Sequence, residues 1–224
     1  MRVLTREQSS QIDRCATTQF GISGLVLMEN AGRAAADLLC QLKVASPIVI
    51  CCGKGNNAGD GYVIARQLLT RHYQVQILNW EDPAKLSNDA RTNYNILKAM
   101  DVEMIDCLTQ GLPHAANILS DAAWIVDALL GIGGSGPARP PIDQAIEAIN
   151  KADAPAFALD VPSGLDCNTG VAPGAVVRAS HTCTFLAPKP GLINHAGKDY
   201  TGQLHVVDLG ISDDVIRVAL GENK

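Results

Sequence analysis

The sequence lacks several features that mark other classes of protein. Only 4% of its 224 residues are aromatic, and no apolar run approaches the roughly 18 residues of a membrane-spanning helix. Its first residues, MRVLTREQSSQIDR, contain no apolar segment of the kind found in secretory leaders. A net charge of -5 provides no overall basic surface for a nucleic-acid backbone. We therefore expect a cytoplasmic protein that binds neither membranes nor nucleic acid.

Cysteines are present, but not in the pairs that hold zinc. The seven cysteines show no C-x-x-C spacing, and Cys51 and Cys52 are adjacent in an apolar run. Successive side chains of a strand point to opposite faces, so we expect both to be small buried hydrophobic residues. His181 and Cys183 could share one face of a strand, which leaves a metal pair as an alternative. Two ligands without a second pair do not complete a zinc site.

The most informative segment is PIVICCGKGNNAGDGYVIARQLLT, residues 47–70. Its apolar residues 48–52 predict a parallel strand buried on both faces, and residues 63–69 have helical spacing. Between them we predict a loop whose four glycines permit positive φ and close approach of the backbone to phosphate. The spacing G-x-G-x-x-x-G-x-G differs from the dinucleotide fingerprint. A ligand-binding loop and a purely structural crossover both remain open.

Strand and helix patterns alternate along the rest of the chain. Two helices are expected first, one running from a T-x-x-Q capping box at residues 5–8 to about residue 19 and one over residues 25–42. Further strands are expected at 75–78, 102–105, 124–130, 156–161, 182–186 and 203–207, and helices at 87–100, 114–119 and 141–152. No helix is expected between the last two strands. We predict a single α/β domain over residues 1–224, a three-layer αβα sandwich around a Rossmann-like, mostly parallel sheet.

Three of the expected strands end in polar segments marked by glycine. These segments begin after residues 52, 126 and 159, and the carboxyl ends of parallel strands share one edge of a sheet. We therefore expect Asn57, Asp127, Asp160 and Ser163 to converge there. A role in a helix cap or turn stays open for Asp127. For Lys189, in the later segment APKPGL, a solvated surface position stays open.

Five segments in series resemble those of the NAD(P)H-hydrate epimerases. They are LMENAG at 27–32, GNNAGDG at 55–61, VDALLGIGGSGPARPPI at 126–142, ALDVPSG at 158–164 and TFLAPKPGL at 184–192. The resemblance extends from about residue 4 to residue 211 and implies the same αβα sandwich. It also implies an isomerase that interconverts the R and S forms of hydrated NADH or NADPH, which carry a hydroxyl at nicotinamide C6. A separate S-specific dehydratase would then restore the dinucleotide.

The resemblance also implies the residues of the site. Substrate contacts are implied for Asn56, Asn57, Ala58, Gly59 and Asp60, for Gly131, Ile132, Gly133, Gly134, Ser135, Gly136 and Pro137, and for Asp160. A potassium ion is implied at Asn57, Asp127 and Ser163, whose oxygens suit a hard cation. Asp160 is expected to be the main acid/base, and Lys189 a second catalytic candidate that orients the hydroxyl or a phosphate. The chain departs from the common pattern at Ile132, where a small polar residue is frequent, and at His181, where an aspartate is.

Two other functions are weighed against the epimerase. A non-catalytic scaffold of the same fold, as in the enhancer-of-decapping proteins, would act by dimerisation, but the polar residues of the site are intact. An NAD-dependent dehydrogenase is disfavoured by the glycine spacing and by the lack of an acid at the end of the second strand. A homodimer formed through residues 6–42 is expected. The preference for NADH or NADPH stays open, as does whether the chain stands alone or is one part of a bifunctional enzyme.

Overall fold

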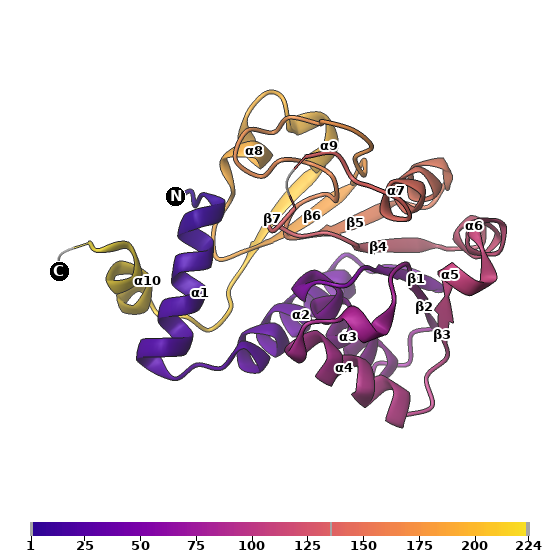
Figure 1. Ribbon diagram of the computed structural model, residues 1–224, viewed down its shortest axis with the longest axis horizontal. Coiled ribbons are helices and arrows are strands. Elements are labelled where there is room, and N and C mark those ends of the chain that lie inside the picture. The colour runs from indigo at the N-terminus through magenta and orange to yellow at the C-terminus, as the bar shows by residue number, and fades with distance from the viewer. Residues whose placement is uncertain (1, 135, 223–224) are drawn as a thin grey trace.

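The computed structural model describes residues 2–134 and 136–222, which form seven strands in one sheet (Figure 1). The strand order is β3-β2-β1-β4-β5-β6-β7, and every pairing is parallel. The strands are β1 (Ile48–Cys52), β2 (Val75–Asn79), β3 (Met104–Asp106), β4 (Trp124–Ala128), β5 (Ala156–Leu159), β6 (His181–Phe185) and β7 (Gln203–Val207). The order reverses between β1 and β4, which confirms the predicted doubly wound sheet.

Helices cover both faces of the sheet, as the sandwich prediction requires (Figure 1). One face is covered by α1 (Arg6–Phe20), α2 (Gly24–Gln41), α3 (Asn56–Leu69), α4 (Asn88–Ala99) and α10 (Asp213–Leu220). The other is covered by α5 (Cys107–Gln110), α6 (Leu112–Ser120) and α7 (Ile142–Lys151). A 3-10 turn, η1 (Pro83–Lys85), precedes α4. No described helix is both long and apolar enough to cross a membrane.

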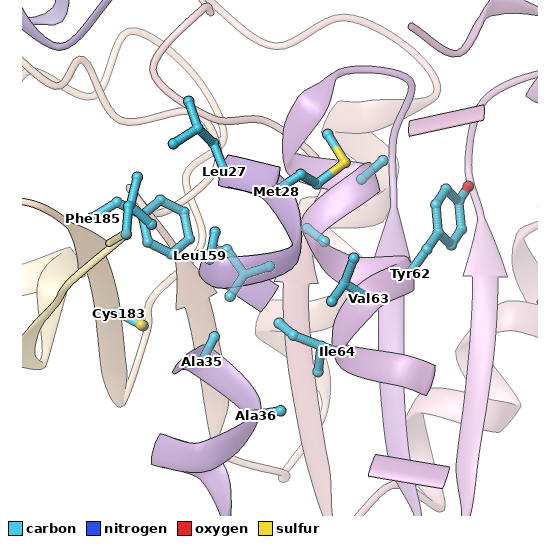
Figure 2. Close-up of a cluster of buried hydrophobic side chains, with 14 of the residues drawn as sticks. Leu27, Met28, Ala35, Ala36, Tyr62, Val63, Ile64, Leu159, Cys183 and Phe185 are labelled. Atoms are coloured by element: carbon cyan, nitrogen blue, oxygen red, sulfur yellow. The ribbon is translucent and has the colours of Figure 1, made fainter. Parts of the chain in front are cut away.

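The core divides at the sheet because alternate strand residues face opposite layers. In β1, Ile48, Ile50 and Cys52 pack with the α2 and α3 layer, and Val49 and Cys51 pack with the α6 and α7 layer. Both adjacent cysteines are fully buried, as predicted. Fully burying a valine or isoleucine side chain, such as those of β1, contributes about 1.5–3 kcal/mol. Figure 2 shows part of the first layer, where α2, α3 and the strands meet at Leu27, Met28, Val63, Ile64, Leu159 and Phe185.

The predicted capping box at the start of α1 is present. The Gln8 amide N–H donates to Thr5 Oγ1 (3.3 Å), and the Thr5 amide N–H donates to Gln8 Oε1 (2.9 Å). The helix ends at Gly21, whose φ of 70° is the left-handed conformation common at a helix end. The first helix is thus confirmed within a residue of its predicted end.

The predicted glycine loop after β1 is wrong in its extent and in the role of its glycines. Helix α3 begins at Asn56, so most of the motif forms the first turns of a helix. None of its glycines has a positive φ. A Cβ on Gly59 would lie 2.5 Å from Met28 Sδ, and one on Gly61 would lie 2.8 Å from Ala128 Cβ. These glycines therefore allow α3 to pack closely on α2 and on the sheet.

The last third of the chain contains helices that the prediction missed. Between β6 and β7 lie two single turns, α8 (Pro190–Ile193) and α9 (Lys198–Thr201), and α10 follows β7. The expectation of no helix between these strands is therefore wrong. Turns of four residues are too short to show an apolar period, so the sequence carries little signal for them. Strands β4 and β5 also end two residues earlier than predicted.

Candidate functional site

The start of α3 lies beside the segment that follows β4. Asn57 is buried, and its Nδ2 donates to the carbonyl oxygen of Leu130 (2.8 Å). A Cβ placed on Gly131 would lie 3.5 Å from Asn57 Cβ, so the two segments are in contact. Gly55, which precedes the helix, provides no side-chain cap. The Ala58 N–H donates to the carbonyl oxygen of Gly55 (3.1 Å), and the N–H groups of Asn56 and Asn57, which have no acceptor among the described residues, can bind an anion. The two segments implied in substrate contact thus form one wall.

Asp127 and Ser163 are bonded to each other at the ends of β4 and β5. Asp127 is fully buried; its Oδ1 accepts from Ser163 Oγ (2.6 Å) and the Leu129 N–H (3.2 Å), and its Oδ2 accepts from the Ser163 N–H (2.8 Å). The Leu130 N–H donates to Ser163 Oγ (2.8 Å). Asn57 bonds the same Leu130, so the three residues implied in metal binding lie around one point. The turn role left open for Asp127 is also present, through Leu129.

The same three residues meet the chemical requirements of a potassium ion. Burial raises the pKa of Asp127 to about 6, and bonds from Ser163 and Leu129 oppose that rise. In the described part of the chain no cationic side chain is placed to offset this carboxylate. Buried carboxylates are normally paired or coordinate a metal. Amide, carboxylate, hydroxyl and carbonyl oxygens therefore surround a position that lacks positive charge, and a hard cation fits there.

Asp160 lies on the next strand end and carries its own cation. Its Oδ1 accepts from Lys189 Nζ and from Thr184 Oγ1 (3.1 Å). Lys189 is 1% exposed, so the solvated surface position left open for it is wrong. Lys189 Nζ also donates to Thr184 Oγ1 (2.9 Å) and to the carbonyl oxygen of Phe185 (3.0 Å). All three N–H bonds of the ammonium are therefore directed at protein atoms. Lys189 is thus placed to orient Asp160, and any effect on a ligand would act through that carboxylate.

Two unusual backbone turns, one centred on Asp160 and one on Leu186, end the strands β5 and β6. Asp160 has a φ of 61°, and the Val161 N–H donates to the carbonyl oxygen of Leu159 (2.7 Å). The neighbouring strand repeats the pattern, with a φ of 64° at Leu186 and a bond from the Ala187 N–H to Phe185 O (2.7 Å). Three-residue turns with a positive central φ are rare and strained. They mark the point where β5 and β6 stop and the site begins.

Two further carboxyl groups, Asp60 and Asp13, lie near the Asp160–Lys189 pair. Asp60, in α3, is 8% exposed, and burial and the charge of Asp160 raise its pKa well above the usual range. Asp13, in α1, reaches solvent, yet desolvation of its carboxyl group and the charge of Asp160 raise its pKa to about 6, against the opposing effect of Lys189. The sequence interpretation missed Asp13, because an aspartate one turn after Ser9 in an amphipathic helix looks like an ordinary solvent-facing residue.

The other residues implied in substrate contact differ in their exposure to solvent. Ala58 and Gly59 are buried within α3, whereas Gly133, Gly134, Gly136 and Pro137 are exposed in the segment between β4 and α7. Ile132 is partly buried, and Ser135 lies outside the described residues. A shallow hollow lies between this segment and the one after Ser163, lined by Leu130, Gly131, Gly134, Gly136, Gly164, Leu165, Asp166 and Pro173. The segment is thus placed to contact a ligand from the solvent side.

His181 lies away from this site. It is the first residue of β6, at the amino end of the strand, and its Nδ1 lies 3.1 Å from His205 Nε2. Cys183 is buried in the core beneath α2. The described residues contain no group of three His, Cys, Asp or Glu side chains placed to hold a metal ion. The departure from the common pattern at His181 therefore leaves the carboxyl edge of the sheet unaltered.

Comparison with known proteins agrees with this geometry. Residues 24–191 match the family described as YjeF-related protein N-terminus, a span that contains the segments after β1, β4, β5 and β6. The NAD(P)H-hydrate epimerase of Pirellula staleyi is 39% identical over 211 residues, covering 94% of this chain and 93% of the relative. The chain belongs to the NAD(P)H-hydrate epimerase family. The resemblance seen in the sequence is thereby confirmed.

Other relatives extend the comparison. The NAD(P)H-hydrate epimerase of Rhodopirellula baltica is 36% identical, with 96% of this chain and 86% of the relative covered. The bifunctional NAD(P)H-hydrate repair enzyme of Moorella thermoacetica is 38% identical over 96% of this chain, which spans 42% of that relative. The solved structure of yeast ynu0 has a TM-score of 0.84 at 23% identity, covering 98% of this chain and 93% of that one, which shows the shared fold.

Proposed function

We propose that the chain is an isomerase that interconverts the R and S forms of hydrated NADH and NADPH. The observation that supports this most is the buried Asp160–Lys189 pair, which lies where the segments implied in substrate contact reach the carboxyl edge of the sheet. Family membership and the relatives named NAD(P)H-hydrate epimerase support the same reaction. The substrate would lie along the start of α3, with its phosphates at the N–H groups of Asn56 and Asn57.

The chemistry requires little of the protein beyond proton transfer and charge. The C6 carbon of the hydrated nicotinamide bears both a hydroxyl and the ring nitrogen. The nitrogen lone pair expels the protonated hydroxyl as water and leaves a planar iminium cation. Water then adds to the opposite face and loses a proton, which inverts the centre. The reaction consumes no oxidant, and it is accelerated by an acid, a base and nearby negative charge.

Asp160 is the residue best placed to supply negative charge and to exchange a proton. Its Oδ1 is occupied by Lys189, Thr184 and the Phe185 N–H, which fixes the carboxylate and leaves Oδ2 for the substrate. Lys189 positions Asp160 and does not contact the substrate itself. Fixed groups of this kind stabilise a developing cation without rearranging during the reaction.

Asn57, Asp127 and Ser163 would hold a potassium ion beside this site. Bound there, the ion would supply positive charge near the phosphates of the substrate. The protein's own contribution is the buried oxygen cluster, in which Asp127 provides the negative charge and Asn57 joins the cluster to α3. The ion would thus fix the position of the segment after β4 relative to that helix.

We also propose a functional link to an NAD(P)H-hydrate dehydratase. Relatives named bifunctional NAD(P)H-hydrate repair enzymes contain a region like this chain within a longer protein. An epimerase makes both forms available to an enzyme that accepts one. The alternative of a non-catalytic scaffold is not favoured, because the buried acidic groups would be costly to retain without a ligand.

A coupled assay tests the proposal directly. The purified chain is mixed with the R form of hydrated NADH and an S-specific dehydratase, and recovery of the reduced nicotinamide absorbance is followed. We expect catalytic amounts to accelerate recovery well above the spontaneous rate. In water enriched in oxygen-18, the epimerised product should carry the label at C6. An unchanged rate with folded protein would favour the scaffold.

A further inference from the structure

Helix α1 is fixed against the catalytic segments, although it lies outside the span matched by the family. The Leu4 N–H donates to the carbonyl oxygen of Pro188 (2.9 Å), next to Lys189. The Arg6 N–H donates to Asn168 Oδ1 (2.9 Å), and the Arg6 guanidinium pairs with Asp166 (3.2 Å). The start of the helix is therefore held to segments that follow β5 and β6.

One side of α1 carries two polar residues, the buried Ser9 and the solvent-exposed Asp13. They are four residues apart, so they lie on one side of the helix with the buried Ala16. Ser9 is 7% exposed, and its Oγ has no hydrogen-bond partner among the described residues. An unpartnered buried hydroxyl is rare in a native protein and indicates a missing ligand or water. This side of α1 therefore offers a polar ligand a buried hydroxyl and, one turn away, an accessible carboxyl group.

Asp13 is close enough to the Asp160–Lys189 pair for both charges to change its pKa. The charge of Asp160 raises its pKa and the charge of Lys189 lowers it, while desolvation is the largest effect. Asp60, on α3, responds in turn to both Asp13 and Asp160. Three carboxyl groups from three separate elements therefore lie near one another, and among the described residues only that of Asp160 forms an ion pair, with Lys189.

We propose that Asp13 is a second acid/base residue of the epimerase, acting on the face of the nicotinamide ring opposite Asp160. The inference rests on the proposed function. Inversion at C6 needs water to leave from one face and to enter from the other, which one carboxyl group on one side does not serve. Helix α1 and the turn after β5 are different elements, so their carboxyl groups can flank a bound ring.

One proton, held by either Asp13 or Asp160, is enough for the proposed reaction. The Asp13 carboxyl gives its proton to the C6 hydroxyl, the C–O bond breaks with its electron pair on the departing water, and the nitrogen lone pair forms the iminium bond. A second water adds to the opposite face of C6 while Asp160 Oδ2 takes its proton. In the reverse direction the two residues exchange roles. The pair must therefore hold one proton in both directions.

The groups that face Asp13 determine its protonation. Asp160 and Lys189 act on it from the segments after β5 and β6, and Asp60 interacts with it from α3. Helix α10 packs against α1, and its Arg217 and Asp213 pair with each other, while Asp213 also lies 3.9 Å from Arg2. With a pKa of about 6, Asp13 titrates near neutral pH, where an acid/base residue is most effective.

The test compares Asp13→Asn with the wild type and with Glu7→Gln. Glu7 lies on the same helix and contacts Asn168, a contact that glutamine keeps. Initial rates are measured in both directions as a function of pH, and binding of intact NADPH is measured separately. We expect Asp13→Asn to lower turnover by about 10²- to 10⁴-fold, with NADPH binding unchanged. Asp13→Glu should recover part of the lost turnover, and Glu7→Gln should match the wild type.

The wild-type pH profile gives a second, independent readout. Turnover should fall in both directions as the pH rises through about 6, because the shared proton is lost. An active wild type without that limb overturns the inference even if Asp13→Asn does not fold. Normal turnover in a folded Asp13→Asn variant, or a loss confined to NADPH binding, overturns it too. An inactive wild type overturns the proposed function, and this inference with it.

Discussion

Two buried aspartates at neighbouring strand ends solve the same electrostatic problem in different ways. Asp127, after β4, is satisfied by Ser163 and Leu129, which are neutral, and the described residues provide it with no cation. Asp160, after β5, is paired with the buried Lys189. Burying a charge without compensation is costly. We therefore propose that the Asp127 carboxylate receives a cation from solution, whereas the Asp160 carboxylate is fixed by its own lysine and faces the substrate.

The largest expected effect follows from removing the charge of Asp160. Asparagine tolerates the left-handed backbone found there, so Asp160→Asn should keep the turn. It removes the proton-exchanging group, and turnover should fall by at least about 10²-fold, within the usual range of about 10²- to 10⁴-fold. Steady-state assays should show the fall in turnover, and stopped-flow measurements should show little change in NADPH binding. Near-normal turnover would remove Asp160 from the chemistry.

Lys189→Met tests the other partner of the ion pair. It leaves the Asp160 carboxylate buried without its cation, and breaking a buried pair costs about 3–5 kcal/mol of unfolding free energy. Chemical denaturation should show this loss, and adding Asp160→Asn should restore part of it. Lys151→Met is the matched control, because the Lys151 side chain is 78% exposed and its pair should contribute less than about 1 kcal/mol. Equal losses in both variants would contradict the buried pairing.

Potassium should distinguish the two aspartates. A ligand present at 100 times its dissociation constant stabilises the folded state by about 2.7 kcal/mol. We expect potassium chloride to raise the unfolding temperature of the wild type above that in an equal concentration of choline chloride. Asp127→Asn should abolish this increment, and Asp160→Asn should retain it. If potassium protects the Asp127 variant equally, the proposed ligand set is incorrect.

Gly53→Ala should produce the smallest effect, and it should affect only the potassium site at Asp127. A Cβ on Gly53 would lie 2.1 Å from the carbonyl oxygen of Leu129, so the segment after β4 must shift. Such overpacking typically costs about 1–3 kcal/mol. The variant should need more potassium for half-maximal protection, while Gly55→Ala, where a Cβ meets no atom within 4 Å, should not. Unchanged potassium dependence in Gly53→Ala would argue against coupling between this segment and the ion.

The sequence predicted the strand alternation and the shared edge where Asn57, Asp127, Asp160 and Ser163 meet, because apolar period and strand polarity are local signals. It did not predict that α3 begins at Asn56. Glycine and asparagine disfavour helices locally, and only packing against α2 and the sheet overrides that preference. Nor did it predict the burial of Lys189. That burial depends on Asp160, which lies distant in the sequence and adjacent only after folding.

The paired turns at Asp160 and Leu186 have a consequence for how this fold can change over time. Strained backbone of this kind costs about 1–3 kcal/mol at each residue and persists only where the surroundings enforce it. A glycine at position 186 would relieve the strain, since glycine adopts positive φ freely. Leu186→Gly should therefore raise the unfolding free energy of the chain. Leucine at this position costs stability, and we propose that it keeps the strand end beside Asp160 rigid.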